Sequence, residues 1–192
     1  HLPMLLANER IRKTKQAKVL TPVAQYLLLY HLQIESIEGL AARDIENKIP
    51  YSYASITLGI TCLEDLGLCE KVSGNSKRKV IHFDKNGMEL WEQAQLFLVN
   101  PIEERIYCDD LLSDDNFPVC GINALAHYTW LNPDPERIIM VPVKQLREFK
   151  SLGVLVRPNE FDGNIIIEAW KYPPVTTIGT KAEWVDRLSL AI

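Results

Sequence analysis

The segment LEDLGLCEKVSGNSKRKVIHF, residues 63–83, decides the fold of the first half of the chain. Gly67 ends an apolar helical pattern, as glycine often does, because it adopts the left-handed backbone conformation without strain. Two short apolar runs then flank a Ser-Gly-Asn-Ser turn, which predicts a β-hairpin. Its returning strand opens with three consecutive bases, Lys77, Arg78 and Lys79. Alone, a basic tip is typical of a solvated strand edge, so its neighbours decide its role.

Helix signals lie on both sides of this hairpin. Thr21 and Pro22 predict the start of a helix through VAQYLLLYHLQ, with threonine as the cap and proline in the first turn. A short helix is expected in LAARDIENKI. Ser52 is a favourable N-cap for the next helix, in which apolar residues recur at helical spacing. Asp84 predicts the cap of an amphipathic helix at 85–98.

This order of elements is that of a winged helix-turn-helix. Residues 20–98 resemble the winged-helix domain of MarR-type transcriptional regulators. Four positions match the family's Leu-Glu-x-x-Gly-Leu-Val step, namely Leu63, Glu64, Gly67 and Leu68. Lys77 falls on the family's wing arginine, and Gly87 on the glycine that opens the last helix. The resemblance implies a recognition helix at about 52–66 and a wing at about 70–83.

The residues expected to contact DNA follow from this assignment. They are Ser52, Tyr53, Ser55, Thr57, Thr61, Lys77, Arg78 and Lys79. Two positions depart from the family: Asn75 replaces its usual acidic residue, and Leu58 stands where arginine is common. Because the helix at 52–66 contains no Lys or Arg, backbone contacts and DNA shape are expected to carry more of the specificity than direct base readout.

Charge is distributed unevenly along a chain of net charge −4. Residues 1–98 hold 12 basic and 11 acidic side chains, whereas residues 99–192 hold 9 basic and 14 acidic ones. The segment RIRKTKQAK at 10–18 carries five bases and no acid. Local basic clusters on an acidic chain indicate contact with phosphates at chosen places rather than general binding of polyanions.

The pattern changes at Asn100-Pro101, where we expect a domain boundary. Residues 1–99 would form the DNA-binding domain and residues 100–192 a small mixed α/β domain for regulation or partner binding, giving an α+β protein. Helices are predicted in GINALAHYTWL (121–131), VKQLREF (143–149) and AEWVDRLSLAI (182–192). Strands are predicted in RIIMVPV (137–143), VLVRP (154–158) and NIIIEAWKY (164–172).

A second resemblance lies in the segment FPVCGINALAHYTWLNPDPERIIMVPV. It is similar to AbiEi-type antitoxins of abortive-infection systems at Gly121, Ala124, Leu125 and His127. This resemblance implies a repressor that counters a cognate toxin. The alternative interpretation of these four residues is an ordinary core helix followed by a buried strand.

Two alternatives to a DNA-binding regulator remain. Winged helices also serve as protein-interaction modules without DNA binding. Asp162, Glu168 and Lys171 have the order of a Mg²⁺-dependent nuclease site. The spacing of Glu168 and Lys171 places them on opposite faces of a strand, so we expect no enzyme.

Four cysteines and four histidines are scattered without metal-ligand spacing. We therefore expect no metal, no cofactor and a reducing, cytoplasmic setting. No apolar run reaches the roughly 20 residues of a membrane span. The expected partners are double-stranded DNA and a second copy of the chain, with the amphipathic helices at 4–18 and 85–98 as candidate dimer elements.

Overall fold

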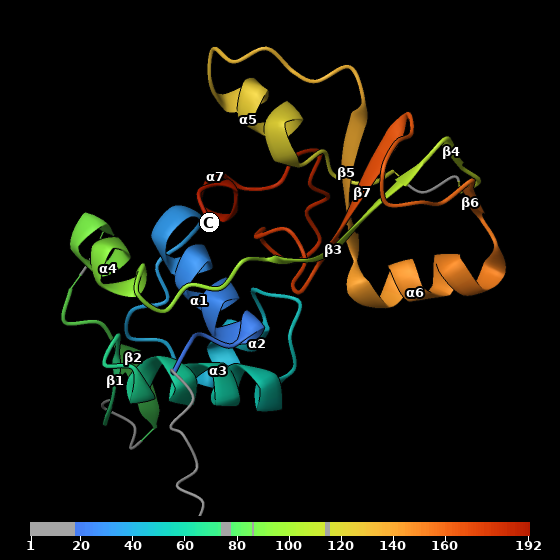
Figure 1. Cartoon of the computed structure of the whole chain (residues 1–192). Helices are drawn as coiled ribbons and strands as arrows, with labels where there is room; N and C mark the ends of the chain where they lie inside the picture. Colours follow the sequence, from blue (N-terminus) through green and yellow to red (C-terminus); the bar gives the residue numbers. More distant parts are fainter. Residues whose placement is uncertain (1–17, 74–77, 86, 114–115) are drawn as a thin grey trace, which may run out of the picture.

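The computed structural model describes residues 18–73, 78–85, 87–113 and 116–192. Its first half contains α1 (Pro22–Gln33), α2 (Ala42–Glu46), α3 (Tyr53–Asp65), β1 (Glu70–Ser73), β2 (Lys79–His82) and α4 (Gly87–Ala94). Its second half contains β3 (Ile102–Cys108), β4 (Asp110–Leu111), α5 (Gly121–Tyr128), β5 (Arg137–Pro142), α6 (Val143–Leu152), β6 (Leu155–Val156), β7 (Ile165–Trp170) and α7 (Arg187–Leu190) (Figure 1). The predicted α+β class is confirmed.

Helix α1 is the central element. The side chain of Thr21 caps it by accepting a hydrogen bond from the Ala24 N–H at 3.3 Å. Every residue from 24 to 30 is buried, which is typical of a helix surrounded by protein on all sides. Helix α3 packs against α1 at Gly59, where an added Cβ would lie only 2.8 Å from a Leu27 methyl group. Glycine at this position therefore permits the close approach of the two helices.

The second half is built on a three-stranded sheet of order β3-β7-β5. Strand β3 is antiparallel to β7, and β5 is parallel to it. Side chains alternate along β5, so Ile138 and Met140 join the main core around α1. Ile139 and Val141 point the other way and form a second core with α6, to which Phe149 contributes.

The main core continues across the expected boundary at residues 99 and 100. Cys120, Trp170 and Val185 of the second half belong to the same buried cluster as Leu27 and Leu63 of the first half. The two halves of the chain therefore share one apolar core. The division into domains at 1–99 and 100–192 stays a prediction.

Buried polar contacts join the same two halves. The Gln25 side chain donates to the Val99 carbonyl at 2.9 Å, accepts from the Val99 N–H at 2.9 Å and donates to the Tyr172 hydroxyl at 3.1 Å. The Tyr26 hydroxyl donates to the Thr176 carbonyl at 2.9 Å. A third link lies at the α2–α3 turn, where the Ile178 N–H donates to the Lys48 carbonyl at 2.8 Å.

Several elements differ from their predicted extents. Helix α4 ends at Ala94 rather than at residue 98, and α7 is a single turn within the predicted 182–192 helix. Strand β3 was not predicted, because a bulge between Ile102 and Glu104 and three charged residues in succession obscure its alternation. Within the described part of the chain, no helix combines the length and apolar character needed to cross a bilayer.

Replacing Gln25 with leucine is expected to lower the free energy of unfolding by about 2–4 kcal/mol, because it leaves both backbone groups of Val99 without their partner. Urea denaturation followed by circular dichroism measures this change. Gln95→Leu is the matched control, since Gln95 is exposed and should change stability by about 0.5 kcal/mol or less. Equal effects of the two substitutions would contradict the structural role of Gln25.

Candidate nucleic-acid interface

Helix α3 presents an outward face without Lys or Arg, and its exposed charge is the carboxylate of Asp65 at its C-terminal end. Its start is fixed by Ser52, whose hydroxyl accepts a hydrogen bond from the Ser55 N–H at 3.4 Å. Leu58 is 72% exposed and Tyr53 is 44% exposed, and Ala54 between them is also exposed. The surface that this helix offers is therefore largely apolar.

The threonine hydroxyls of α3 are engaged within the helix. Thr57 Oγ1 donates to the Tyr53 carbonyl at 2.8 Å, and Thr61 Oγ1 donates to the Thr57 carbonyl at 2.9 Å. Thr61 also accepts a hydrogen bond from Lys71 Nζ at 2.8 Å. Because a hydroxyl carries one proton, neither threonine retains a donor for a phosphate oxygen. Within the described residues, Tyr53 keeps its hydroxyl free of hydrogen bonds.

The β1–β2 hairpin brings cations beside α3. Arg78 and Lys79 are exposed and form no ion pair with any residue that the structure describes. Lys77 lies outside the described residues, as do the 10–18 cluster and the expected dimer helix at 4–18. The neighbouring carboxylate of Glu64 instead pairs with Lys71 at 2.7 Å. Arg78 and Lys79 are therefore available to an external anion.

A pocket of about 570 Å³ lies between α2, α3 and the hairpin. Leu40, Ile60 and Ile81 are among its apolar lining residues. Four cationic side chains line it, namely Arg43, Lys71, Arg78 and Lys79, and none of the lining residues is acidic. We call this feature the cationic pocket.

Two of these cations are partly neutralised by neighbours outside the lining. Arg43 pairs with Glu46 at 2.8 Å and also lies over the Tyr53 ring, 4.5 Å from its centroid. Lys71 pairs with Glu64. Neither Arg43 nor Lys71 was predicted from the sequence as a site residue. The sequence shows a basic residue in α2 and another at the start of the hairpin, but only the folded structure places both in the wall of one pocket.

The hairpin is fixed to the loop between α1 and α2. Backbone hydrogen bonds join Gly39 N–H to the Ile81 carbonyl at 2.9 Å and Ile81 N–H to the Leu40 carbonyl at 3.0 Å. The Glu38 carboxylate accepts from the Phe83 N–H at 2.8 Å and contacts His82 Nδ1 at 2.6 Å. These contacts hold the direction in which the hairpin projects.

Two histidines at the base of the hairpin have opposite pKa shifts. The hydrogen bond that protonated His82 donates to the Glu38 carboxylate raises the pKa of His82 above its ordinary value. His31 stacks on the Phe83 ring at 4.0 Å between centroids, and burial lowers the pKa of His31.

The residues of the nuclease alternative each contact other groups of the chain. Glu168 is buried, and its carboxylate contacts Arg105 at 2.5 Å and Trp170 Nε1 at 3.2 Å. The Lys171 ammonium donates to the Asn100 carbonyl at 2.9 Å. Each group therefore has its own intramolecular partner.

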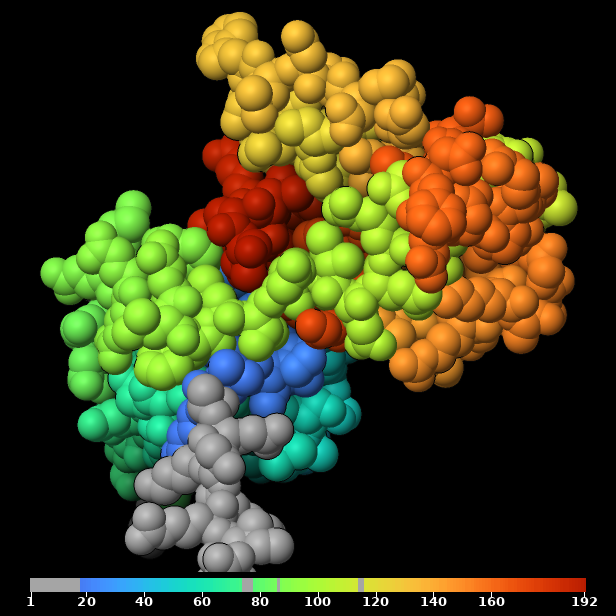
Figure 2. Space-filling view, in the orientation of Figure 1, coloured from blue at the N-terminus to red at the C-terminus, as the bar shows by residue number. Residues whose placement is uncertain are grey.

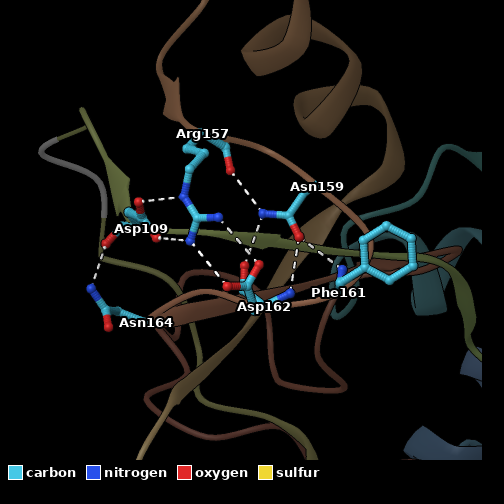
Figure 3. Close-up of polar contacts among 6 residues, drawn as sticks. All are labelled: Asp109, Arg157, Asn159, Phe161, Asp162 and Asn164. Carbon is cyan, nitrogen blue, oxygen red and sulfur yellow. Dashed lines mark hydrogen bonds and ion pairs between the residues drawn. The ribbon is translucent and has the colours of Figure 1, made fainter.

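The third acid of that alternative, Asp162, belongs to a surface cluster. Arg157 forms a two-point contact with Asp109, both distances being 2.7 Å, and contacts Asp162 at 3.2 Å (Figure 3). Asn159 closes the turn by accepting from the Asp162 N–H at 2.9 Å. In the described ranges, no group of three or more His, Cys, Asp or Glu side chains is placed to hold a metal ion.

Comparisons with known proteins identify no relative: no family model, no curated protein and no solved structure matches this chain. The geometry of α3, the hairpin and the cationic pocket therefore carries the functional argument by itself.

The histidine shifts predict opposite contributions to stability as pH changes. The His82–Glu38 contact should stabilise the fold below about pH 6.5, the ordinary histidine value, and lose its effect as pH rises through the raised pKa. Half-buried His31 should destabilise the fold as pH falls below about 6.5 toward its lowered pKa.

Ring-proton NMR titration of the two histidines measures both values. Glu38→Gln keeps a hydrogen-bond acceptor for the Phe83 N–H but removes the charge, so it should return the pKa of His82 toward its ordinary value. A His82 that titrates identically in the wild type and in this variant would contradict the assigned cause.

Proposed function

We propose that this chain is a DNA-binding transcriptional regulator that uses a winged helix-turn-helix, with α3 as the recognition helix and the β1–β2 hairpin as the wing. The observation that carries the proposal is the cationic pocket. It brings Tyr53 and Thr57 of α3 together with Arg78 and Lys79, two cations that have no ion pair in the described chain. A phosphate backbone is the polyanion that such a surface fits.

In the proposed complex, α3 lies in the major groove. A helix with its side chains is about 10–12 Å across, and the groove is about 12 Å wide. The exposed Leu58 and Ala54 side chains would meet thymine methyl groups, while Tyr53 would supply a hydroxyl donor. With no Lys or Arg in α3 itself, the proposal implies modest sequence discrimination by the helix.

The hairpin supplies phosphate attraction in this arrangement. Glu38 and the backbone bonds of Ile81 hold the hairpin against the α1–α2 loop, so its cations are positioned before DNA arrives. Preorganised cations lose less side-chain and loop entropy on binding than mobile ones. In this arrangement, the affinity for DNA depends mainly on the hairpin, and the position of the protein along the duplex depends on α3.

Neutralising Lys77, Arg78 and Lys79 together by glutamine is expected to weaken binding to duplex DNA. The slope of log affinity against log salt should become shallower by about 0.9 for each phosphate contact that is lost. Fluorescence anisotropy over a salt series measures this slope.

The matched control neutralises three cations of α6, Lys144, Arg147 and Lys150, which changes the net charge equally. Helix α6 lies far from the hairpin in the fold (Figure 1). The control should keep the wild-type salt slope. Equal loss of slope in both triple variants would show that total charge, rather than the hairpin, controls binding.

A protein-interaction module is the second candidate function, and the exposure of Leu58 favours it. An exposed leucine beside a tyrosine on a helix without Lys or Arg is also what a protein partner would bury. The two functions differ in what a new positive charge at this position would do.

Leu58→Lys is expected to raise the affinity for duplex DNA and to steepen the salt slope by about 0.9, because it adds one cation within the groove. Leu96→Lys is the control, since Leu96 is 82% exposed after α4. Electrophoretic mobility shifts on duplex DNA compare the three proteins. Absence of duplex binding by all three at moderate salt would favour the interaction module.

The proposed role as a repressor and antitoxin with a cognate toxin rests on the sequence resemblance of residues 121–127. The acidic second half would then capture the partner protein or pair two copies of the regulator. A cytoplasmic location and the absence of enzymatic activity belong to the same proposal.

A further inference from the structure

A loop at the far end of the molecule from α3 carries a fully exposed tryptophan. Trp130 has a relative exposure of 103% and lies two residues beyond the end of α5. Figure 2 shows that the segment around α5 projects beyond the rest of the visible surface. A large aromatic side chain left wholly in water is unusual in a soluble chain, and tryptophan is enriched where interfaces concentrate their binding energy.

A pocket of about 480 Å³ lies beside this tryptophan. Leu131, the residue after Trp130, lines it together with Pro133 and Pro135. Its remaining wall includes His127 and Trp184, whose rings stack in parallel with centroids 4.3 Å apart. The pocket thus has the apolar and aromatic lining that an indole ring requires.

The loop that bears these features is held in place. The Asn123 side chain donates to the Glu136 carbonyl and accepts from the Asp134 N–H, both at 2.8 Å. The Thr129 hydroxyl donates to the Leu125 carbonyl at 2.8 Å and accepts from the Leu131 N–H at 3.3 Å. A fixed loop pays little ordering entropy when it binds.

The rim of the pocket carries one charge of each sign. Glu136 and Arg137 both line it, and neither forms an ion pair with a residue in the described ranges. A two-fold axis can place Glu136 of one copy opposite Arg137 of the other. The same axis then places Arg137 of the first copy opposite Glu136 of the second, so that both contacts join opposite charges.

We infer that this chain pairs with a second copy of itself through the loop at 129–137, with Trp130 of each copy entering the pocket formed by Leu131, Pro133, Pro135, His127 and Trp184 of the other. The same loop supplies both parts, since Leu131, which directly follows Trp130, lines the pocket, and a two-fold interface needs projection and pocket close together on one copy. Glu136 of one copy would pair with Arg137 of its neighbour.

This inference does not depend on DNA binding, and it constrains how DNA could be bound. The loop and α3 lie at opposite ends of the molecule (Figure 1). Two copies joined through the loop would direct their α3 helices away from each other. Such a dimer would hold two separate DNA segments instead of two adjacent half-sites.

Sedimentation equilibrium of the full chain without DNA tests the interface. The wild type should dimerise with rising concentration, and Trp130→Ala should raise the dimer dissociation constant at least tenfold. Phe161→Ala, at an 84% exposed aromatic residue elsewhere on the surface, should leave it unchanged. A wild type that stays monomeric at its highest soluble concentration, or a dimer indifferent to Trp130→Ala, would overturn the inference.

Charge reversal tests the pairing of the two rims. Glu136→Arg and Arg137→Glu should each weaken the dimer, because each single reversal brings like charges together. An equimolar mixture of the two variants should regain dimerisation, since every contact across the axis is then between opposite charges. A mixture that associates no better than either variant alone would exclude the two-fold arrangement. Circular dichroism of each variant confirms that the fold is retained.

Discussion

Gln25 lies on the central helix with its side chain fully buried, where it hydrogen-bonds both backbone groups of Val99 and the hydroxyl of Tyr172. A buried amide left without partners is costly, so the chain following α4 has one favourable position relative to α1. Tyr172 follows β7 and also contacts Ser189 in α7 at 3.2 Å. The Gln25 side chain therefore fixes the position of α1 relative to two segments. One is the chain at Val99, just before the second half, and the other is the chain at Tyr172, near its end.

The segment after β7 also links α1 to the proposed DNA-binding surface, and it thereby restricts the position of α3. Tyr26 exchanges hydrogen bonds with Thr176 in both directions, and Ile178 then bonds to Lys48 just before α3 begins. Helix α3 packs on α1 through Gly59. The orientation of α3 thus depends on contacts from residues beyond 170, and the second half acts as part of the framework for the first.

Local signals in the sequence predicted the elements of the first half well. Thr21 and Ser52 cap α1 and α3 as expected, and Gly67 ends α3 with the positive φ that its position requires. Strand β3 was missed because its bulge and consecutive charges hide the alternation, and α4 is shorter than its amphipathic pattern indicated. The assignment of Arg43 and Lys71 to one pocket depends on tertiary placement, which short sequence patterns do not specify. The full exposure of Trp130 was missed for the same reason.

The distribution of cations implies different roles for α3 and for the hairpin in the proposed binding of DNA. The outward face of α3 carries shape and apolar contact without cations, whereas the hairpin carries cations at a position fixed by Glu38. Electrostatic attraction is long-ranged and indifferent to sequence, while apolar contact acts only at close fit. A protein arranged in this way would approach any duplex readily and discriminate weakly from a single copy. Linking two copies would raise affinity only where two DNA segments can be reached together, because the second contact is then made at a high effective concentration. In the proposed dimer, the Trp130 loop, remote from α3, would provide such a link between segments that are distant along the DNA.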